Sequence, residues 1–256
     1  MTNAETALST LKVNLITKDD IRDILRLGLA DFQRAPVFGL FFGLIFSLIG
    51  IAIVTALYQG NVGYWIFPIA AGFPLIGPFA AVGLYEVSRR LELGEPLAIR
   101  PILLAGFRQK NAQLPLFAVF AVFAFLVWLV LARVIFAISF GTSPVTNIMT
   151  SLEVFLTGPG ILMLFVGTCV GAALAALLFA VSVIGVPLLL DRDIDVVTAM
   201  ITSVQATLEN VKTMSAWGAF VTVSIVIGML PIFLGVVLVF PILGFASWHL
   251  YQRVID

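Results

Sequence analysis

Histidine, cysteine and charged residues are the scarcest features of this 256-residue chain. Charged residues make up 11% of it, whereas about a quarter of the residues in an ordinary soluble domain are charged. Hydrophobic residues make up 61%, and the mean hydropathy is +1.13. A single water-soluble core cannot bury so much apolar surface, so the composition predicts an integral membrane protein.

Each scarcity excludes a class of site. The single cysteine, Cys169, lies in an apolar run, which excludes a disulfide framework or a cysteine-based metal cluster. The single histidine, His249, excludes a haem–copper oxidase core within this chain, because haem iron needs axial ligands. The 14 basic and 14 acidic residues balance, so net charge indicates no nucleic-acid partner. With no phosphate-binding glycine loop and no plausible Ser–His pair, we predict a protein that is not an enzyme and that holds no cofactor or metal.

Four long uncharged runs follow the polar N-terminal segment, and they cover residues 35–85, 111–132, 154–190 and 213–252. A membrane-spanning helix needs about 20 apolar residues, so the first run holds two spans with a turn at residues 59–61. The next two runs hold one span each, near 114–139 and 160–188. The last run holds two short spans hinged near 228–231. The sequence thus predicts an all-α protein with six spans, or with five if residues 214–250 form one span and a re-entrant piece.

The basic residues give the bundle an orientation. Every Lys and Arg except Arg133 lies before the first span, between the second and third, between the fourth and fifth, or after the sixth. The opposite loops, 59–63 and 141–158, hold none. Since basic loops remain on the cytoplasmic side, both termini are expected in the cytoplasm.

A repeat is visible in the cytoplasmic segments. Residues 21–28 align with residues 99–106, and a looser third copy covers 196–210. Each copy follows acidic residues, which are favoured at a helix N-terminus, and residues 17–20 fit a capping box. We therefore predict three interfacial amphipathic helices, at residues 19–34, 96–112 and 195–211.

These helices divide the protein into three parallel units, each an amphipathic interfacial helix followed by a transmembrane hairpin. The expected organisation is a polar N-terminal tail, 1–16, with no removable signal peptide, and a single membrane domain, 17–256. The units within that domain cover about 17–92, 93–190 and 191–256.

The stretch 67–96 links the first unit to the second. It begins as an apolar run broken by prolines and glycines, and it ends in charge at Glu86, Arg89 and Arg90. These three residues have the i, i+3 and i, i+4 spacing that places them on one helix face. We favour an interfacial ion pair with headgroup contacts over a site for a transported substrate.

Two candidate residues lie near opposite ends of the spans. His249, in Trp248-His249-Leu250-Tyr251, is either a metal or haem ligand or part of an interfacial aromatic belt, and we favour the belt. Arg133 is the only basic residue inside a predicted span, and an intramembrane charge is a functional hypothesis by default. It lies close to the outer face, however, where snorkelling or an ion pair with Glu153 is the favoured interpretation.

A cluster of acids follows the fourth span. Asp191, Asp193 and Asp195 alternate within five residues. Alternate acids can bind a divalent cation, but the glycine and the terminal Glu of a calcium loop are missing. We favour an acidic cap at the start of the next helix.

Two spans carry small residues spaced four apart, namely Gly39, Gly43 and Ser47 in one, and Gly167, Gly171 and Ala175 in the other. Such faces let transmembrane helices approach closely. Both stripes are therefore expected to be helix-packing surfaces.

Three stretches, 70–97, 186–203 and 230–255, resemble the prokaryotic integral membrane family numbered 2189 among the domains of unknown function. The resemblance extends from about residue 15 to the C-terminus. It implies a multi-pass protein of the bacterial inner membrane and supplies no catalytic residue. Some relatives carry a cytochrome c oxidase subunit label, and many have His where Phe245 stands here.

Three functional hypotheses follow. The first is a non-catalytic accessory or assembly factor of a respiratory membrane complex, with the lipid bilayer, other membrane subunits or further copies of itself as partners. The alternative is a transporter or channel for a small solute or a lipid, using a cavity between the three units. The third, an oxidase core, is all but removed by the histidine count.

Overall fold

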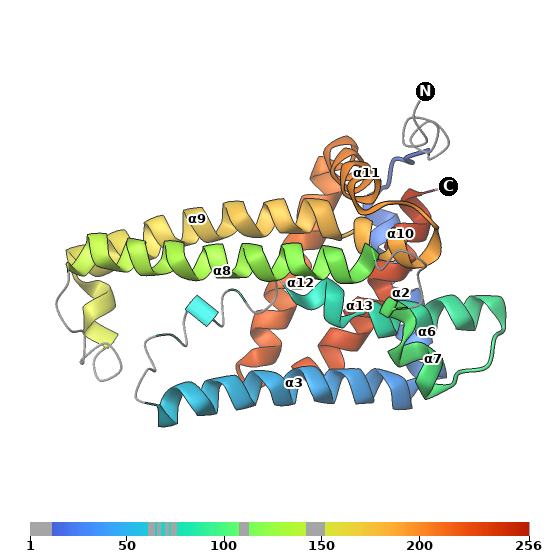
Figure 1. Ribbon diagram of the computed structural model, residues 1–256, viewed down its shortest axis with the longest axis horizontal. Coiled ribbons are helices and arrows are strands. Elements are labelled where there is room, and N and C mark those ends of the chain that lie inside the picture. The colour runs from blue at the N-terminus through green and yellow to red at the C-terminus, as the bar shows by residue number, and fades with distance from the viewer. Residues whose placement is uncertain are drawn as a thin grey trace.

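The computed structural model describes residues 12–60, 65, 68–69, 72, 76–107, 113–141 and 152–255. Over these residues the protein is all-helical, as predicted, and the pairing of Val13 with Ile255 is an isolated β-bridge (Figure 1). The helices are α2 (Lys18–Arg34), α3 (Pro36–Gln59), α5 (Gly77–Ala80), α6 (Val82–Leu93), α7 (Ile99–Leu103), α8 (Gln113–Phe140), α9 (Gly158–Ser182), α10 (Gly185–Asp191), α11 (Val196–Glu209), α12 (Val211–Met229) and α13 (Val236–Val254), with 3-10 turns η3 (Ala105–Phe107) and η4 (Leu152–Leu156).

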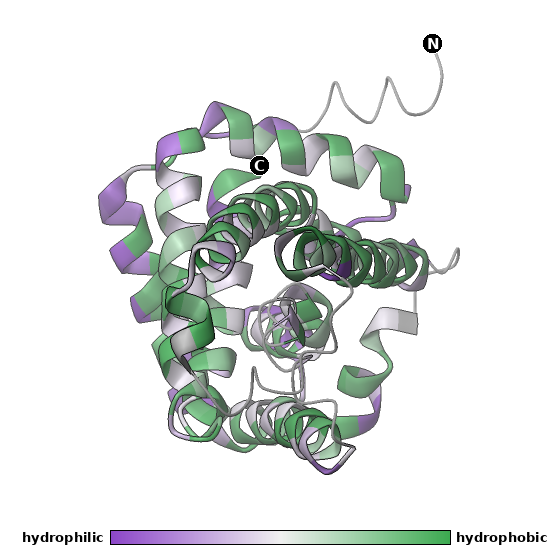
Figure 2. Cartoon of the chain, turned by 90° about the vertical axis from the view of Figure 1, so that its left-hand side faces the viewer, coloured by the Kyte–Doolittle hydropathy of each residue, from purple (hydrophilic) through white to green (hydrophobic). Residues whose placement is uncertain are grey.

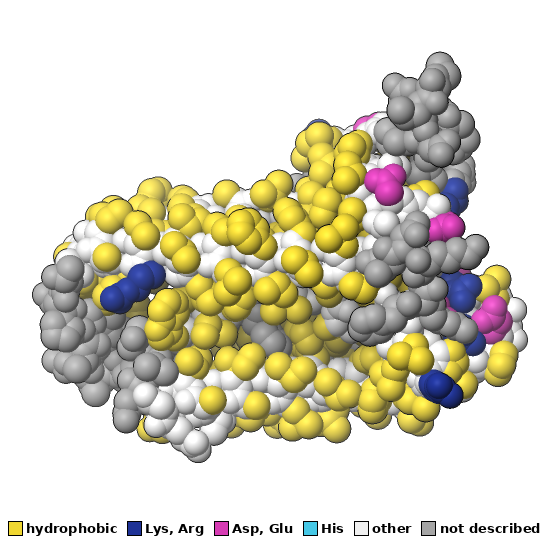
Figure 3. All heavy atoms as spheres, in the orientation of Figure 1, with side chains coloured by type: hydrophobic (Ala, Val, Ile, Leu, Met, Phe, Trp, Pro, Cys, Tyr) yellow, Lys and Arg dark blue, Asp and Glu magenta, His cyan; other side chains and the backbone are white. Residues whose placement is uncertain are grey.

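Within this part of the chain, four helical segments are long and apolar enough to cross a membrane: α3, α8, α9 with α10, and α12. The helices α3, α8 and α9 run along the long axis of the molecule, and their outer faces carry exposed Leu, Val, Ile and Phe side chains (Figures 1 and 3). Viewed almost end-on in Figure 2, these long helices are apolar over most of their length. The protein is therefore an integral membrane protein.

Charged side chains gather at one end of the molecule, on the right in Figure 3. We call this the charged end and define it as residues 12–17, α2, α6 and the C-terminal residues 248–255. The first and last described segments meet there, because the Asn14 N–H donates to the Val254 carbonyl at 2.8 Å and Arg253 pairs with Asp20 at 2.7 Å. Residues 12–20 and 253–255 thus lie on the same side.

Local chemistry explains the start of the first two helices. The Thr17 hydroxyl accepts from the Asp20 N–H at 3.3 Å, and the Asp20 carboxylate accepts from the Thr17 N–H at 2.8 Å. This is the predicted capping box, and it is confirmed. Pro36 then occupies the first turn of α3, where its missing N–H removes no hydrogen bond.

The predicted boundaries can be compared with these helices. α3 ends at Gln59, and α8 covers the span expected at 114–139. The span expected at 160–188 is formed by α9 and α10 with a turn at residues 183–184, and the predicted hinge near 228–231 is a turn between α12 and α13. The expected helix at 96–112 is instead broken into α7 and η3, with a turn at Leu104, and residues 108–112 lie outside the described part. Pro101 lies in the first turn of α7, where its missing N–H removes no helical hydrogen bond.

Candidate functional site

A cavity of about 570 Å³ lies between the helices, and α6, α8, α9, α12 and α13 all contribute to its lining. On α9 its lining runs from Met163 to Ser182, which corresponds to about 29 Å of helix at 1.5 Å per residue. The hydrocarbon core of a bilayer is about 30 Å thick. The cavity is therefore long relative to its volume and extends through most of the apolar part of the bundle.

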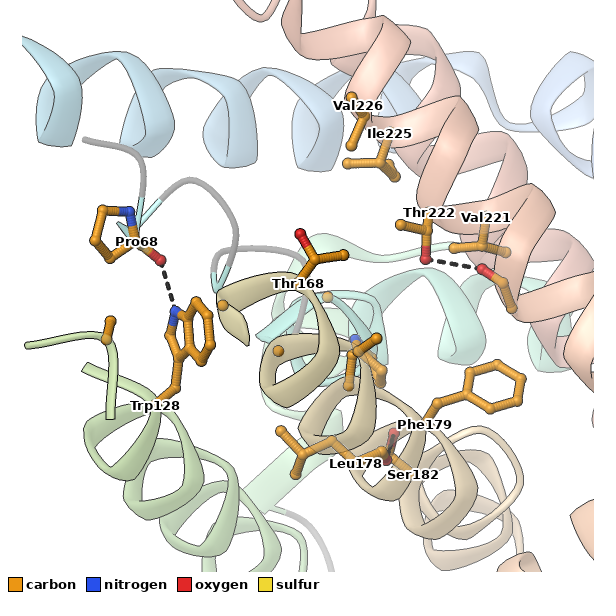
Figure 4. Close-up of a pocket in the computed structure, with 18 of the residues that line it drawn as sticks. Pro68, Trp128, Thr168, Leu178, Phe179, Ser182, Val221, Thr222, Ile225 and Val226 are labelled. Carbon is orange, nitrogen blue, oxygen red and sulfur yellow. Dashed lines mark hydrogen bonds between the residues drawn. The ribbon is translucent and has the colours of Figure 1, made fainter. Parts of the chain in front are cut away.

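The walls of the cavity are mainly apolar. The labelled side chains in Figure 4 include Trp128 from α8, Leu178 and Phe179 from α9, and Ile225 and Val226 from α12. No Asp, Glu, His or Cys is among the described residues that line it. Such a lining suits a hydrocarbon chain and disfavours an ion or a small polar solute.

The small residues of α9 keep this space open. A Cβ atom at Gly167 would meet nothing within 4 Å, whereas one at Gly171 would lie 3.0 Å from the Trp128 ring. Both glycines and Ala175 line the cavity. The expectation that this stripe is a helix-packing surface therefore holds at Gly171, which packs against Trp128 of α8, and is wrong at Gly167, which no helix covers.

Most polar groups in the cavity already have partners. The hydroxyls of three lining residues donate to carbonyls of their own helices: Ser182 to Leu178, Thr222 to Gly218, and Ser247 to Leu243. The Trp128 indole N–H donates to the Pro68 carbonyl at 2.7 Å (Figure 4). These groups leave few donors for a ligand.

Two lining hydroxyls, those of Thr168 and Tyr85, make no hydrogen bond to any residue that the structure describes, and Thr168 is exposed. Tyr85 lies on α6 and is buried, with 3% of it exposed. An unsatisfied buried hydroxyl costs about 1–3 kcal/mol. Tyr85 therefore provides a donor that is available to a molecule in the cavity.

Arg133 lines the opposite end of the cavity. Gln113, at the start of α8, accepts from the Val196 N–H at 3.0 Å near the charged end, and Arg133 lies 20 residues further along the helix, or about 30 Å away. Arg133 is exposed and makes no ion pair with a described side chain. The predicted pair with Glu153 stays a prediction, because the Glu153 side chain lies outside the described residues.

His249 is buried at the charged end, in the last two turns of α13, beyond the apolar stretch of that helix. Its Nε2 lies 2.8 Å from an Asp31 carboxylate oxygen and its Nδ1 lies 3.3 Å from Glu92. Ser88 also donates to Asp31, at 2.7 Å. A histidine between two carboxylates is held as the imidazolium, since both ring nitrogens can then donate.

The electrostatics agree with this geometry. Burial alone lowers the pKa of His249, but the hydrogen bonds to Asp31 and Glu92 outweigh it and raise that pKa to about 9. Burial raises the pKa of Glu92, and the hydrogen bonds from His249, Trp248 and Gln252 more than reverse this, so the pKa falls below its usual value. His249 and Glu92 are therefore charged at neutral pH, and with Asp31 they link α2, α6 and α13.

The interpretation of residues 248–251 as an interfacial aromatic belt does not hold. Trp248 and Tyr251 are fully buried, and they donate to Glu92 at 3.0 Å and to Asp191 at 2.7 Å. α13 packs against α2, α3 and α6, so its aromatic residues face protein instead of lipid headgroups.

The structure brings Glu86, Arg89 and Arg90 together, as their spacing predicted. Glu86 is 3% exposed and lies 2.9 Å from the Arg89 Nε and 2.6 Å from the Arg90 Nε. Arg90 also reaches Glu95 at 3.2 Å and donates to the Pro96 carbonyl at 3.1 Å. Because Arg90 is buried and its Nε and Nη1 atoms bind groups of the protein, this cluster stabilises α6 and the following turn instead of facing headgroups.

The acids after α10 do not converge. Asp191 accepts from the Tyr251 hydroxyl, and Asp193 is exposed. Asp195 is the N-cap of α11, where it accepts from the Thr198 N–H at 2.9 Å. The acidic-cap interpretation is therefore right for Asp195, and over the described ranges no group of three or more His, Cys, Asp or Glu side chains could hold a metal ion.

Sequence reasoning missed Asp31, Glu92 and Tyr85. A signal for Asp31 was present, because Ile24, Gly28 and Asp31 are the buried positions of α2 and have the i, i+4, i+7 spacing of one helix face. An acid on the face that should be apolar indicates a buried partner. Nothing in the sequence distinguishes Tyr85 from a packed aromatic residue.

Residues 66–191 match the sequence model of the predicted integral membrane protein family numbered 2189 among the domains of unknown function. The family resemblance is thereby confirmed over this region, which holds α5 to α10 and much of the cavity lining. The stretch 230–255, which also carried the resemblance, lies outside the match. No curated protein and no solved structure matches the chain.

Proposed function

We propose that this relative of a predicted integral membrane protein family binds a long apolar or amphipathic molecule in its central cavity and moves it within the bilayer. The observation that carries the proposal is the cavity itself, which is about 570 Å³ in volume, mainly apolar, and as long as the hydrocarbon core. Its volume lies within the range of about 300–1,000 Å³ that is typical of ligand sites. This corresponds to the lipid form of the transporter hypothesis.

Ions and small polar solutes fit the cavity less well. Coupling or carrying an ion in a membrane requires ionisable or carbonyl ligands near the middle of the bundle. Three of the four described serine and threonine hydroxyls that line this cavity donate to their own helices, and the fourth, Thr168, is a neutral hydroxyl that offers no charge to an ion. The absence of paired acids, bases and nucleophiles among the described lining residues also supports our proposal that the protein is not an enzyme.

We further propose six spans in three units, with both termini in the cytoplasm of a bacterial cell and the bundle in its inner membrane. The contact of Ser88 with Asp31 supports a return of the chain to the charged end after α3. The contact of Val254 with Asn14 supports a second return, after α12. The accessory role in a respiratory complex, with other subunits or further copies as partners, rests on the family label alone and stays a prediction.

Filling the cavity tests the ligand proposal. Gly167→Leu places a side chain in open space, so we expect the affinity for a fluorescent long-chain probe in detergent micelles to fall at least tenfold while the melting temperature stays within about 2 °C. Ile161→Phe, on the exposed face of the same helix and outside the cavity lining, is the matched control. Equal affinity in the parent, Gly167→Leu and Ile161→Phe proteins would show that the probe binds elsewhere.

Cysteine labelling tests the topology. In a Cys169→Ser background, a cysteine at Gly60 should react with an impermeant maleimide from outside intact cells, and a cysteine at Lys18 should react only after the membrane is opened. Labelling of the Gly60 position only from the cytoplasmic side would overturn the six-span arrangement.

A further inference from the structure

We infer that the ligand is a long-chain lipid with a neutral carbonyl oxygen, which accepts a hydrogen bond from the Tyr85 hydroxyl at the charged end of the cavity. The inference rests on the proposed function and names the chemical class of the molecule bound. Its starting point is a buried donor in an apolar space.

Tyr85 is buried, and its hydroxyl has no hydrogen-bond partner among the described residues. Buried hydroxyls are almost always hydrogen-bonded, and Tyr85 is 3% exposed with no such bond to a described residue. The neighbouring lining hydroxyls, Ser182 and Ser247, donate to carbonyls of their own helices at 2.6 and 2.8 Å. Tyr85 is thus a donor at this end of the cavity that a ligand can engage.

Tyr85 lies at the charged end of the cavity. Ser88, one turn further along α6, donates to Asp31 at the charged end, and Ser247 lies two residues before His249. From this end the cavity follows α9 away toward Met163, a distance of about 29 Å. A polar group held at Tyr85 therefore leaves the whole apolar length for a hydrocarbon chain.

The charged side chains around Tyr85 favour a neutral carbonyl over a carboxylate as the polar group of the ligand. The cations nearest to Tyr85 in the sequence, Arg89 and Arg90, are engaged with Glu86 and Glu95, and His249 lies between Asp31 and Glu92. Burying a carboxylate at this end would leave it without a counter-ion, which is costly. Arg133 could pair with an anion, but it lies at the opposite end.

The test uses single-chain probes that differ in one group. Methyl palmitate carries a carbonyl, hexadecyl methyl ether lacks it, and palmitate carries a charge. Each competes with a fluorescent long-chain probe for the full-length protein in neutral detergent. We expect the ester to bind about three- to tenfold more tightly than the ether, the size of one net hydrogen bond.

Three variants test whether the preference for the ester comes from the Tyr85 hydroxyl. Tyr85→Phe should bring ester affinity down to ether affinity without lowering the melting temperature, since no hydrogen bond to a described residue is lost. Ser182→Ala is the matched control, because its hydroxyl is bonded within α9, and it should keep the preference. Arg133→Gln should leave ester binding unchanged.

Two results would overturn the inference while leaving the proposed function intact. The first is equal affinity for ester and ether in the parent, or an ester preference that survives in Tyr85→Phe, as expected if Tyr85 bonds only to water. The second is that palmitate binds more tightly than the ester and loses this advantage in Arg133→Gln. That result would place the polar head of the ligand at the Arg133 end of the cavity. If no chain competes with the probe, or Gly167→Leu does not weaken binding, the proposed function itself fails.

Discussion

The two small-residue stripes look alike in sequence and differ in the structure. On α3, a Cβ atom at Gly43 would lie 2.2 Å from the Val237 carbonyl oxygen, and the Ser47 hydroxyl donates to the Phe233 carbonyl at 3.1 Å. On α9, a Cβ atom at Gly167 would meet nothing within 4 Å. The first stripe lets α13 pack closely against α3, whereas the second packs against Trp128 of α8 at Gly171 and opens onto the cavity at Gly167. A small residue therefore permits close approach without causing it, and the partner helix decides the outcome.

The difference extends to the polar groups on each side. The closed side, α2 with α3 and α13, has buried charges with partners, as at Asp31 and His249. The open side, α8 with α9, has the exposed Arg133 and, across the cavity, the Tyr85 hydroxyl. We conclude that the closed side provides stability and the open side provides the space for a ligand, and the predictions below test that division.

The largest effect is expected from Gly43→Leu. The side chain would overlap backbone atoms of α13, which cannot move aside as a flexible side chain can. We expect the loss of stability to be on the order of 4 kcal/mol or more, seen as aggregation or a collapsed melting temperature in detergent. Gly167→Leu is the matched substitution on the open side, and equal destabilisation by the two would remove the distinction.

His249→Ala is expected to have the next largest effect. It leaves the Asp31 and Glu92 carboxylates at the charged end without their shared cation, and removing one partner of a buried ion pair costs about 3 kcal/mol. The measurement is the melting temperature in neutral detergent, with binding of the long-chain probe as a second readout. If the division is right, surviving folded protein should bind the probe normally.

The same group predicts a pH dependence. The pKa of His249 is about 9 in the folded protein against 6.5 for the free side chain. Because the folded pKa is raised, the stabilisation is fully present below about pH 6.5 and is lost as the pH rises through about 9. The melting temperature should therefore fall by a few degrees between pH 6.5 and 9.5. His249→Phe should flatten this dependence, and a parent profile as flat as that of the variant would contradict the assignment.

Much of the fold could be predicted from hydropathy, because a bilayer demands long apolar helices wherever the chain crosses it. The C-terminal end of α3, both ends of α8 and the capping box at Thr17 followed from uncharged runs and from local residue types, whereas the break between α9 and α10 did not. The candidate site could not be predicted in the same way. Whether Gly167 faces a helix or a cavity depends on where α12 and α13 lie, which the spacing within α9 does not encode.

The charged end shows the same limit. Trp248 and His249 lie where an interfacial belt is expected, and only the packing of α13 against α2 and α6 shows that they are buried. The partners of His249 are 218 and 157 residues away in sequence, at Asp31 and Glu92. Without such long-range information, a lone histidine could not be recognised as the centre of an ion network.

Gly167→Ala and Gly43→Ala are expected to change the stability of the protein in opposite directions. Both changes are small compared with the effects described above. Replacing a mid-helix glycine by alanine stabilises a helix by about 0.5–1 kcal/mol when the methyl group meets no obstacle. At Gly167 there is none within 4 Å, so the melting temperature should rise slightly. At Gly43 the methyl group would lie 2.2 Å from a backbone oxygen, so α13 must shift and the melting temperature should fall. Two changes of the same sign would mean that the stripes are equivalent and that the cavity is not held open by the structure of α9.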